Sequence, residues 1–167
     1  PTNFTTTKYL SSKAVQLDDG SIVCVAYMLV DGDKGYYSSA AFRSVDQGFS
    51  YEFLSMIGTP QDAPWGNHGP GEPGIERLPS GELLCVMRTG SYSSWSERGG
   101  SAPMLMARSS DGGKTWQKKF LNRPGVIPKL LHMSNGVLVC SFGRPGNNLM
   151  FSLDNGKSWG AEVEITP

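Results

Sequence analysis

The sequence predicts an all-β protein built from three repeats of one four-stranded unit. The first observation is a short phrase that occurs three times and reads Ser-x-Asp-x-Gly-x-Ser/Thr-aromatic. The second is an apolar run that follows a turn glycine three times, and the third is the lack of convincing helical periodicity along the chain. A phrase that recurs within one chain indicates a repeat architecture. Its three copies are 44–51, 109–116 and 152–159.

Each copy of the phrase is expected to close a hairpin between two antiparallel strands. Asp and Ser side chains bond nearby backbone N–H groups and hold a turn, and glycine takes the positive φ that the turn requires. The aromatic residue then enters an apolar layer and fixes the hairpin to the body. We therefore assign Asp46, Asp111 and Asp154 a structural role rather than an acid–base or metal-binding one.

Each unit is expected to contain four strands. The turn glycines Gly20, Gly81 and Gly136 repeat after 61 and 55 residues. Such four-stranded antiparallel repeats describe the blades of a β-propeller, so we expect one partial propeller domain over 1–167. The expected blades are approximately 1–58, 59–122 and 123–167, with first strands at 13–17, 74–78 and 129–133, second strands at 21–30, 82–89 and 137–142, third strands at 37–43, 104–108 and 148–151, and fourth strands at 52–56, 117–121 and 162–165.

The composition argues against several classes of partner. The chain has 167 residues with 15 basic and 15 acidic side chains and contains no basic block, so we expect no nucleic-acid partner and no anionic membrane surface. No apolar run approaches the roughly 20 residues of a membrane-spanning helix, and no signal peptide is visible. The 21 glycines and 11 prolines fit many short strands joined by turns.

The three cysteines are expected to be small buried apolar residues. Cys24, Cys85 and Cys140 each lie four residues after a turn glycine, inside an apolar strand. This placement favours a packing role over redox or metal use, and the spacing matches no zinc pattern. We therefore expect no metal and no cofactor.

The three phrases resemble the Asp boxes, or BNR repeats, of the sialidase (neuraminidase) superfamily. The resemblance covers essentially the whole chain and implies a sialidase-like propeller, of whose expected six blades three are present. Asp boxes also occur in unrelated, non-catalytic propellers, so they indicate the fold more strongly than the chemistry. A half-propeller leaves sheet edges open, and we expect the remaining blades to come from a longer chain or from a second copy.

The middle repeat carries the candidate catalytic residues. Segment 71–89 resembles the sialidase segment in which a Glu begins the first strand of a blade and an Arg ends the second. The resemblance implies that Glu72 orients a tyrosine nucleophile and that Arg88 binds the carboxylate of sialic acid. The turn at 79–81 independently places both at one end of the blade, where they form a charge-assisted pair or face a ligand. The alternative is a structural ion pair between neighbouring strands.

Three further residues are candidates for substrate binding. Arg144 follows Cys140 much as Arg88 follows Cys85, so both arginines leave equivalent strands at the same end. The resemblance implies that Arg144 is a second carboxylate ligand, with a solvated turn residue as the alternative. His68 precedes the first strand of the same blade, and Trp95 lies in the loop after its second strand. Either is a candidate wall of a sugar site or an exposed loop residue.

The resemblance implies an exo-α-sialidase-like glycoside hydrolase when the propeller is complete. Its partner would be a sialylated or other glycan, and family habit alone suggests a secreted or periplasmic location. The sequence departs from the family pattern, because Val126-Ile127-Pro128 lacks the expected preceding Arg and no tyrosine follows Tyr92. A non-catalytic Asp-box propeller that binds glycan or protein remains an alternative, as does a hydrolase acting on another sugar.

Overall fold

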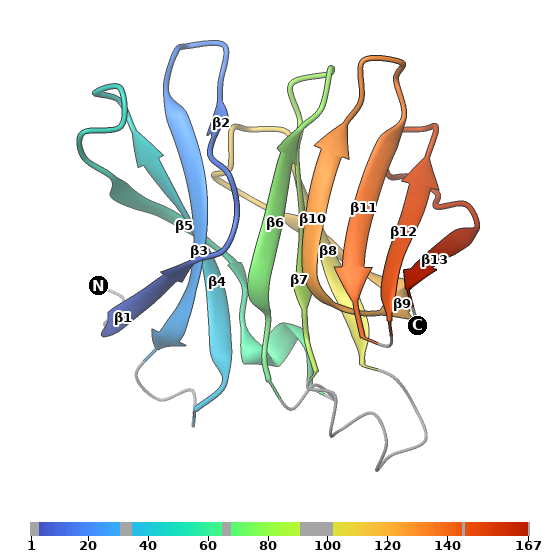
Figure 1. Ribbon diagram of the computed structural model, residues 1–167. Coiled ribbons are helices and arrows are strands. Elements are labelled where there is room, and N and C mark those ends of the chain that lie inside the picture. The colour runs from blue at the N-terminus through green and yellow to red at the C-terminus, as the bar shows by residue number, and fades with distance from the viewer. Residues whose placement is uncertain (1–3, 31–34, 65–67, 91–101, 145, 167) are drawn as a thin grey trace.

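The computed structural model describes residues 4–30, 35–64, 68–90, 102–144 and 146–166, and Figure 1 shows three antiparallel sheets side by side. The predicted all-β fold with three four-stranded antiparallel blades is confirmed, with β2 as a short additional strand. Blade 1 contains β1 (Phe4–Leu10), β2 (Val15–Gln16), β3 (Ile22–Val30), β4 (Tyr37–Ser44) and β5 (Glu52–Gly58). Blade 2 contains β6 (Gly71–Arg77), β7 (Leu83–Arg88), β8 (Pro103–Ser109) and β9 (Gln117–Pro124). Blade 3 contains β10 (Val126–His132), β11 (Leu138–Gly143), β12 (Asn147–Ser152) and β13 (Glu162–Thr166).

The first strands of the blades differ from their predicted positions. β6 and β10 begin three residues earlier than expected, because each strand contains a register shift. The shift lies at Glu72 in β6 and at Ile127 in β10, and both residues have a φ of +51°. In blade 1 the position of the first strand is divided between β1 and β2, which both pair with β3. A bulged, left-handed residue interrupts the alternation of side chains, so the sequence pattern indicated only the regular part of each strand.

Apolar side chains fill the two interfaces between neighbouring blades. One buried cluster joins blades 1 and 2 and includes Val23, Val25, Ile57, Ile75 and Cys85. A second joins blades 2 and 3 and includes Leu84, Val86, Leu130, Leu138 and Cys140. Burial raises the pKa of the Cys140 thiol to about 12, so the group stays protonated at neutral pH and behaves as a small apolar side chain.

The three Asp phrases form the same hydrogen-bonded turn. In the first, the Asp46 carboxylate accepts bonds from the Ser44 hydroxyl at 2.7 Å and from the Ser50 backbone N–H at 2.9 Å, and the Ser44 hydroxyl accepts the Gly48 N–H at 2.8 Å. Asp111 and Asp154 make the corresponding bonds in blades 2 and 3. The side chains thus satisfy backbone groups that the tight turn leaves unpaired.

The hairpins closed by the Asp phrases of blades 2 and 3 are each fixed to the preceding blade. The indole N–H of Trp116 in blade 2 donates to the Ser55 hydroxyl of β5 at 2.9 Å, and the Ser55 hydroxyl donates to Gly113 O at 2.5 Å. In blade 3, Trp159 packs against the cluster shared with blade 2. Tyr51 of blade 1 is 41% exposed, because no sheet precedes blade 1 among the described residues. The expected burial of the phrase aromatic is therefore wrong for Tyr51.

Acid is expected to weaken these turns. Hydrogen bonds from Thr115, first from its hydroxyl and then from its backbone N–H, lower the pKa of Asp111 from 3.8 to about 2. A carboxyl whose pKa is depressed by folding stabilises the fold fully above its unfolded pKa, and this contribution is lost as the pH falls through the folded value. We expect the free-energy difference between wild type and Asp111→Asn, measured by urea unfolding, to shrink from pH 5 to about pH 2. A difference that does not change with pH would contradict this account.

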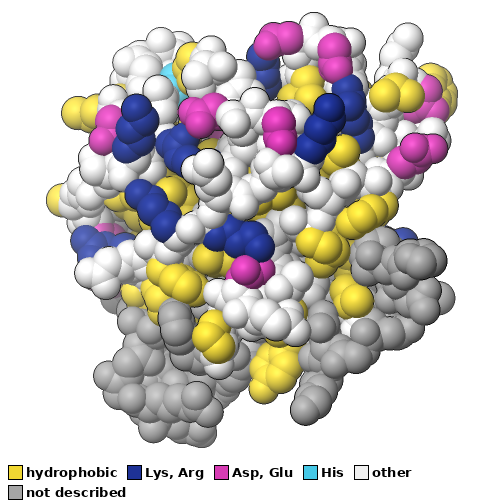
Figure 2. Space-filling model, turned by 180° about the vertical axis from the view of Figure 1, so that it is seen from behind, with side chains coloured by type: hydrophobic (Ala, Val, Ile, Leu, Met, Phe, Trp, Pro, Cys, Tyr) yellow, Lys and Arg dark blue, Asp and Glu magenta, His cyan; other side chains and the backbone are white. Residues whose placement is uncertain are grey.

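The described part of the chain contains one 3₁₀ turn, Pro60–Asp62, and no helix long and apolar enough to cross a membrane. On the face seen in Figure 2, basic and acidic side chains lie interspersed, in keeping with the net charge of zero.

The blades have two distinct ends. We call the end with the Asp-phrase turns the box end, and the end at which β6 and β10 begin the site end.

Candidate functional site

The site end of blade 2 holds Glu72 and Arg88 in direct contact. Gly71 is paired with Arg88 in the register of β6 and β7, so Glu72 lies beside the end of β7. The Arg88 Nη1 donates to Glu72 Oε1 at 2.7 Å, and the two side chains are only 9% and 15% exposed. The structure therefore brings the two predicted catalytic residues together as a largely buried, charge-assisted pair.

Glu72 also connects blade 2 to blade 3. Its Oε2 accepts the backbone N–H of Ile127 at 2.9 Å, from the equivalent bulge of β10. Arg88 Nε donates in turn to Gly90 O at 2.6 Å. The pair is thus held in place by protein groups on both sides, and Glu72 and Ile127 share the same left-handed backbone conformation at equivalent bulges.

A second carboxylate on β6 forms a similar contact at the box end. Glu76 Oε2 accepts the backbone N–H of His132 at 2.9 Å and pairs with Lys13 Nζ at 2.6 Å. The strands β6 and β10 are therefore bridged by carboxylates at both ends. No sequence pattern indicated a role for Glu76, and its bonds to all three blades assign it a structural one.

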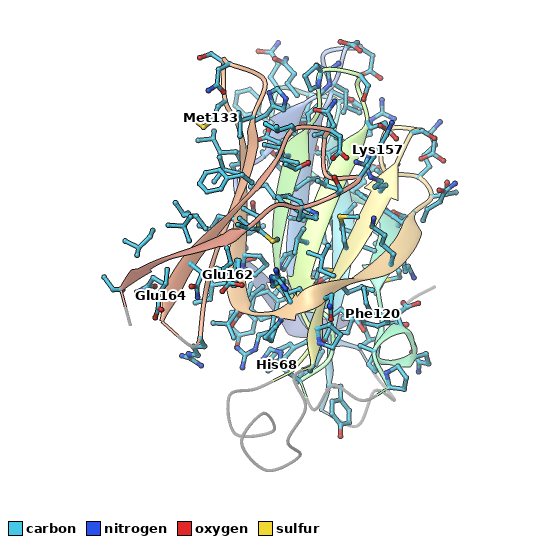
Figure 3. The ribbon with its side chains drawn as sticks, turned by 90° about the vertical axis from the view of Figure 1, so that its right-hand side faces the viewer. His68, Phe120, Met133, Lys157, Glu162 and Glu164 are labelled. Atoms are coloured by element: carbon cyan, nitrogen blue, oxygen red, sulfur yellow. The ribbon has the colours of Figure 1, made fainter. Side chains whose placement is uncertain are left out.

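His68 lies beside the pair, at the end of the molecule opposite Met133 and Lys157 (Figure 3). Its backbone bridges two blades, because His68 O accepts the Tyr37 N–H at 2.9 Å and His68 N donates to Thr89 O at 3.3 Å. Burial, and then the nearby Arg88 guanidinium, lower the pKa of His68 below its ordinary value of 6.5. The ring is therefore neutral at neutral pH and able to accept a hydrogen bond.

Three tyrosines extend the site across blade 1, and sequence reasoning did not assign them to it. Tyr27 stacks on Tyr9 with ring centroids 5.1 Å apart, and Tyr37 meets Tyr27 edge-on at 5.1 Å. Burial, and then the Glu72 carboxylate, raise the pKa of Tyr27 above 10. One signal was available, since Tyr27 occupies the place in the first repeat that Arg88 occupies in the second.

Arg144 lies at the site end of blade 3, in a separate hollow. It follows β11 with a φ of +58°, its side chain is exposed, and no bond to that side chain occurs among the described residues. The hollow has a volume of about 440 Å³ and is also lined by Ile127, Asn147 and Ile165. Ile127 connects this hollow with the Glu72–Arg88 pair, because it lines the hollow and its backbone N–H donates to the Glu72 carboxylate.

One further side chain among the described residues lies near Glu72. Lys129 of β10 has a buried Nζ with no hydrogen-bond partner in the described part of the chain. Burial lowers the pKa of Lys129, and the Glu72 carboxylate opposes this shift. Trp95 lies outside the described residues, so its place at a sugar site stays a prediction.

No protein-family model matches the sequence, and no curated protein matches it. Solved structures do share its fold. A protein of unknown function from Dyadobacter fermentans is 16% identical with a TM-score of 0.74, and the alignment covers 95% of this chain and 42% of that one. The GH93 α-L-arabinofuranosidase of Fusarium graminearum in complex with arabinobiose is 19% identical with a TM-score of 0.70, and the coverage is 100% and 51%. The Hadza microbial sialidase Hz136 is 17% identical with a TM-score of 0.63, and the coverage is 95% and 30%.

These likenesses establish the fold, which is that of propeller glycoside hydrolases. The chain spans between 30% and 51% of the length of the three structures. A sialidase and an α-L-arabinofuranosidase share this fold with the chain, so the fold does not distinguish between acidic and neutral sugars as substrates.

Proposed function

We propose that these blades form part of the sugar-binding end of a propeller glycoside hydrolase that removes terminal acidic sugars, as sialidases do. The supporting observation is the unpaired Arg144 side chain at the site end of blade 3. Arg88 is paired with Glu72, whereas no bond to the Arg144 side chain occurs among the described residues. The buried Lys129 Nζ has no hydrogen-bond partner there, but it interacts electrostatically with Glu72. The carboxylate of an acidic sugar would supply the missing negative charge, and the planar arginine fork suits it.

The proposed role of Glu72 follows from its contacts. It fixes Arg88 and, by the resemblance to sialidases, orients a tyrosine nucleophile. Tyr27 does not fit that role, because its pKa is raised rather than lowered. We propose that the nucleophile comes from the blades that complete the propeller. Sialidases with a tyrosine nucleophile are exceptions to the scheme of two carboxylates.

A neutral sugar is the second candidate substrate. Two nitrogens of Arg88 are already bonded to Glu72 and to Gly90, which reduces the capacity of Arg88 to bind a ligand carboxylate. Enzymes that share the fold support this reading, since one of them was solved with arabinobiose. The non-catalytic propeller that binds glycan or protein is the remaining alternative.

Sugar binding to the purified chain tests the proposal. We expect N-acetylneuraminic acid to bind more tightly than arabinobiose in an NMR titration, and Arg144→Ala to weaken that binding about tenfold through loss of a charge-assisted hydrogen bond. Lys157→Ala is the matched control, because it removes one exposed positive charge at the opposite end (Figure 3).

The other outcomes are equally informative. Preferential binding of arabinobiose that Arg144→Ala weakens would replace the acidic substrate with a neutral one. Equal weakening by Arg144→Ala and Lys157→Ala would reduce the effect to general attraction between opposite charges. Failure of both sugars to bind at millimolar concentration would favour the protein-binding alternative.

A further inference from the structure

Four aromatic rings form a continuous surface beside the Glu72–Arg88 pair. Tyr9 stacks on Tyr27 with an interplanar angle of 26°, and Tyr37 meets Tyr27 at 73°. His68 continues the surface, with its ring centroid 4.7 Å from that of Tyr37. We call these four residues the aromatic wall.

The sheet register fixes the wall at the site end of blade 1. Tyr9 is the cross-strand partner of Tyr27 in β1 and β3, and Tyr37 is paired with Leu29 in β3 and β4. A Cβ added to Gly71 would lie 3.0 Å from the His68 ring and 3.5 Å from the Tyr27 ring. Because Gly71 immediately precedes Glu72, the wall adjoins the first strand of blade 2 directly at the candidate site.

The wall is not a repeating part of the scaffold. Tyr27 lies three residues after Cys24, and the residue three after Cys85 in blade 2 is Arg88. A residue needed only to close the interface between blades would be expected in both places. The site end is therefore divided between a charged part in blades 2 and 3 and an uncharged aromatic part in blade 1.

The wall combines ring surface with available hydroxyl groups. Tyr9 is 44% exposed, and Tyr27, Tyr37 and His68 are half-buried. No hydrogen bond from the three tyrosine hydroxyls occurs within the part of the chain that the structure describes. The raised pKa of Tyr27 keeps its proton in place as a donor, and the neutral His68 ring offers an acceptor.

We propose that the aromatic wall is a second sugar-binding subsite, which holds a neutral sugar residue next to the one bound at Glu72 and Arg88. The inference rests on the proposed function, since it takes the Glu72–Arg88 end as the place of the terminal sugar. Sugar rings present apolar C–H faces and hydroxyl edges, and tyrosines offer both a flat apolar face and a polar tip. The bound glycan thus runs from blades 2 and 3, which hold its acidic end, toward blade 1.

Binding of a neutral disaccharide to the purified chain tests the subsite. We use lactose as the probe and follow the tyrosine ring resonances by NMR. We expect Tyr9 and Tyr27 to shift on titration, and Tyr9→Leu to weaken lactose binding about fivefold, as loss of a packed aromatic face does. Tyr51→Leu is the control, because Tyr51 is similarly exposed, at 41%, and lies at the box end of the same blade.

A second variant separates binding from folding. Tyr27→Phe keeps the ring and removes the hydroxyl, so it preserves the packing against Tyr9 and Tyr37. We expect it to weaken lactose binding about fivefold through loss of one hydrogen bond. The midpoint of thermal unfolding should change less than in a variant that removes the whole ring. Unchanged lactose affinity in both Tyr9→Leu and Tyr27→Phe overturns the subsite and leaves the wall a structural contact.

The two proposals fail in different ways. If N-acetylneuraminic acid binds and Arg144→Ala weakens that binding, while lactose affinity is unchanged in Tyr9→Leu and Tyr27→Phe, only the subsite proposal is wrong. If lactose binds through the wall while the acidic sugar does not bind, the subsite holds and the acidic substrate is wrong. If neither sugar binds, both proposals are overturned.

Discussion

Glu72→Gln is expected to lower the turnover of the complete propeller at least a hundredfold while changing substrate affinity much less. The variant keeps the size of the side chain and removes the negative charge that holds Arg88 and that the proposed mechanism uses near the reacting groups. It also leaves the largely buried guanidinium without a counter-ion. We therefore expect a loss of about 3 kcal/mol in the free energy of unfolding, measured by urea titration.

Glu76→Gln is the matched control for this change. It alters the same side chain on the same strand, and Glu76 also accepts a backbone N–H from β10. Its cationic partner, Lys13, is 44% exposed and can be solvated when the pair is broken. We expect a loss of about 1 kcal/mol and unchanged turnover. Equal effects of the two variants on turnover would reduce Glu72 to a structural bridge between blades.

Gly74→Ala is expected to destabilise the interface between blades 2 and 3 by about 3 kcal/mol. A Cβ at Gly74 would lie 2.3 Å from Pro128 O and 3.0 Å from Pro128 C. Both atoms belong to the backbone of β10 and cannot rotate away, so β6 and β10 would have to separate. Urea unfolding of the purified chain measures the effect.

Gly160→Ala provides the comparison for Gly74→Ala. Its added Cβ would meet only Phe151 O, at an ordinary contact distance of 3.4 Å, and Gly160 is exposed. We expect a change within about 0.5 kcal/mol. Similar stabilities for the two variants would mean that the inner strands are not packed as closely as described.

Most of the fold could be predicted because its information is local. The turn at Asp46 is made by side chains and backbone groups no more than four residues apart, so its residues occur as one recognisable phrase. The starts of β6 and β10 were missed because Glu72 and Ile127 take a left-handed conformation. A contact that stabilises such a conformation comes from another blade and leaves no mark in the local pattern.

The candidate site was predictable to the same extent. The contact between Glu72 and Arg88 follows from one antiparallel pair and one turn, which the sequence indicates directly. The bond from Ile127 to Glu72 spans 55 residues and depends on how two blades pack. The aromatic wall likewise joins β1, β3 and β4 to His68, so only Tyr27 could be connected with the site, through its place in the repeat.

The bond between Trp116 and Ser55 has a consequence for synthesis on the ribosome. The two residues are 61 positions apart, and the later one closes the interface of the earlier blade. At a translation rate of roughly 5 to 20 residues per second, Trp116 would be synthesised roughly 3 to 12 s after Ser55, so blade 1 would lack this contact during that time. During that interval the apolar face around Val25 and Ile57 is open to chaperones, so slow translation through blade 2 should raise the demand for them.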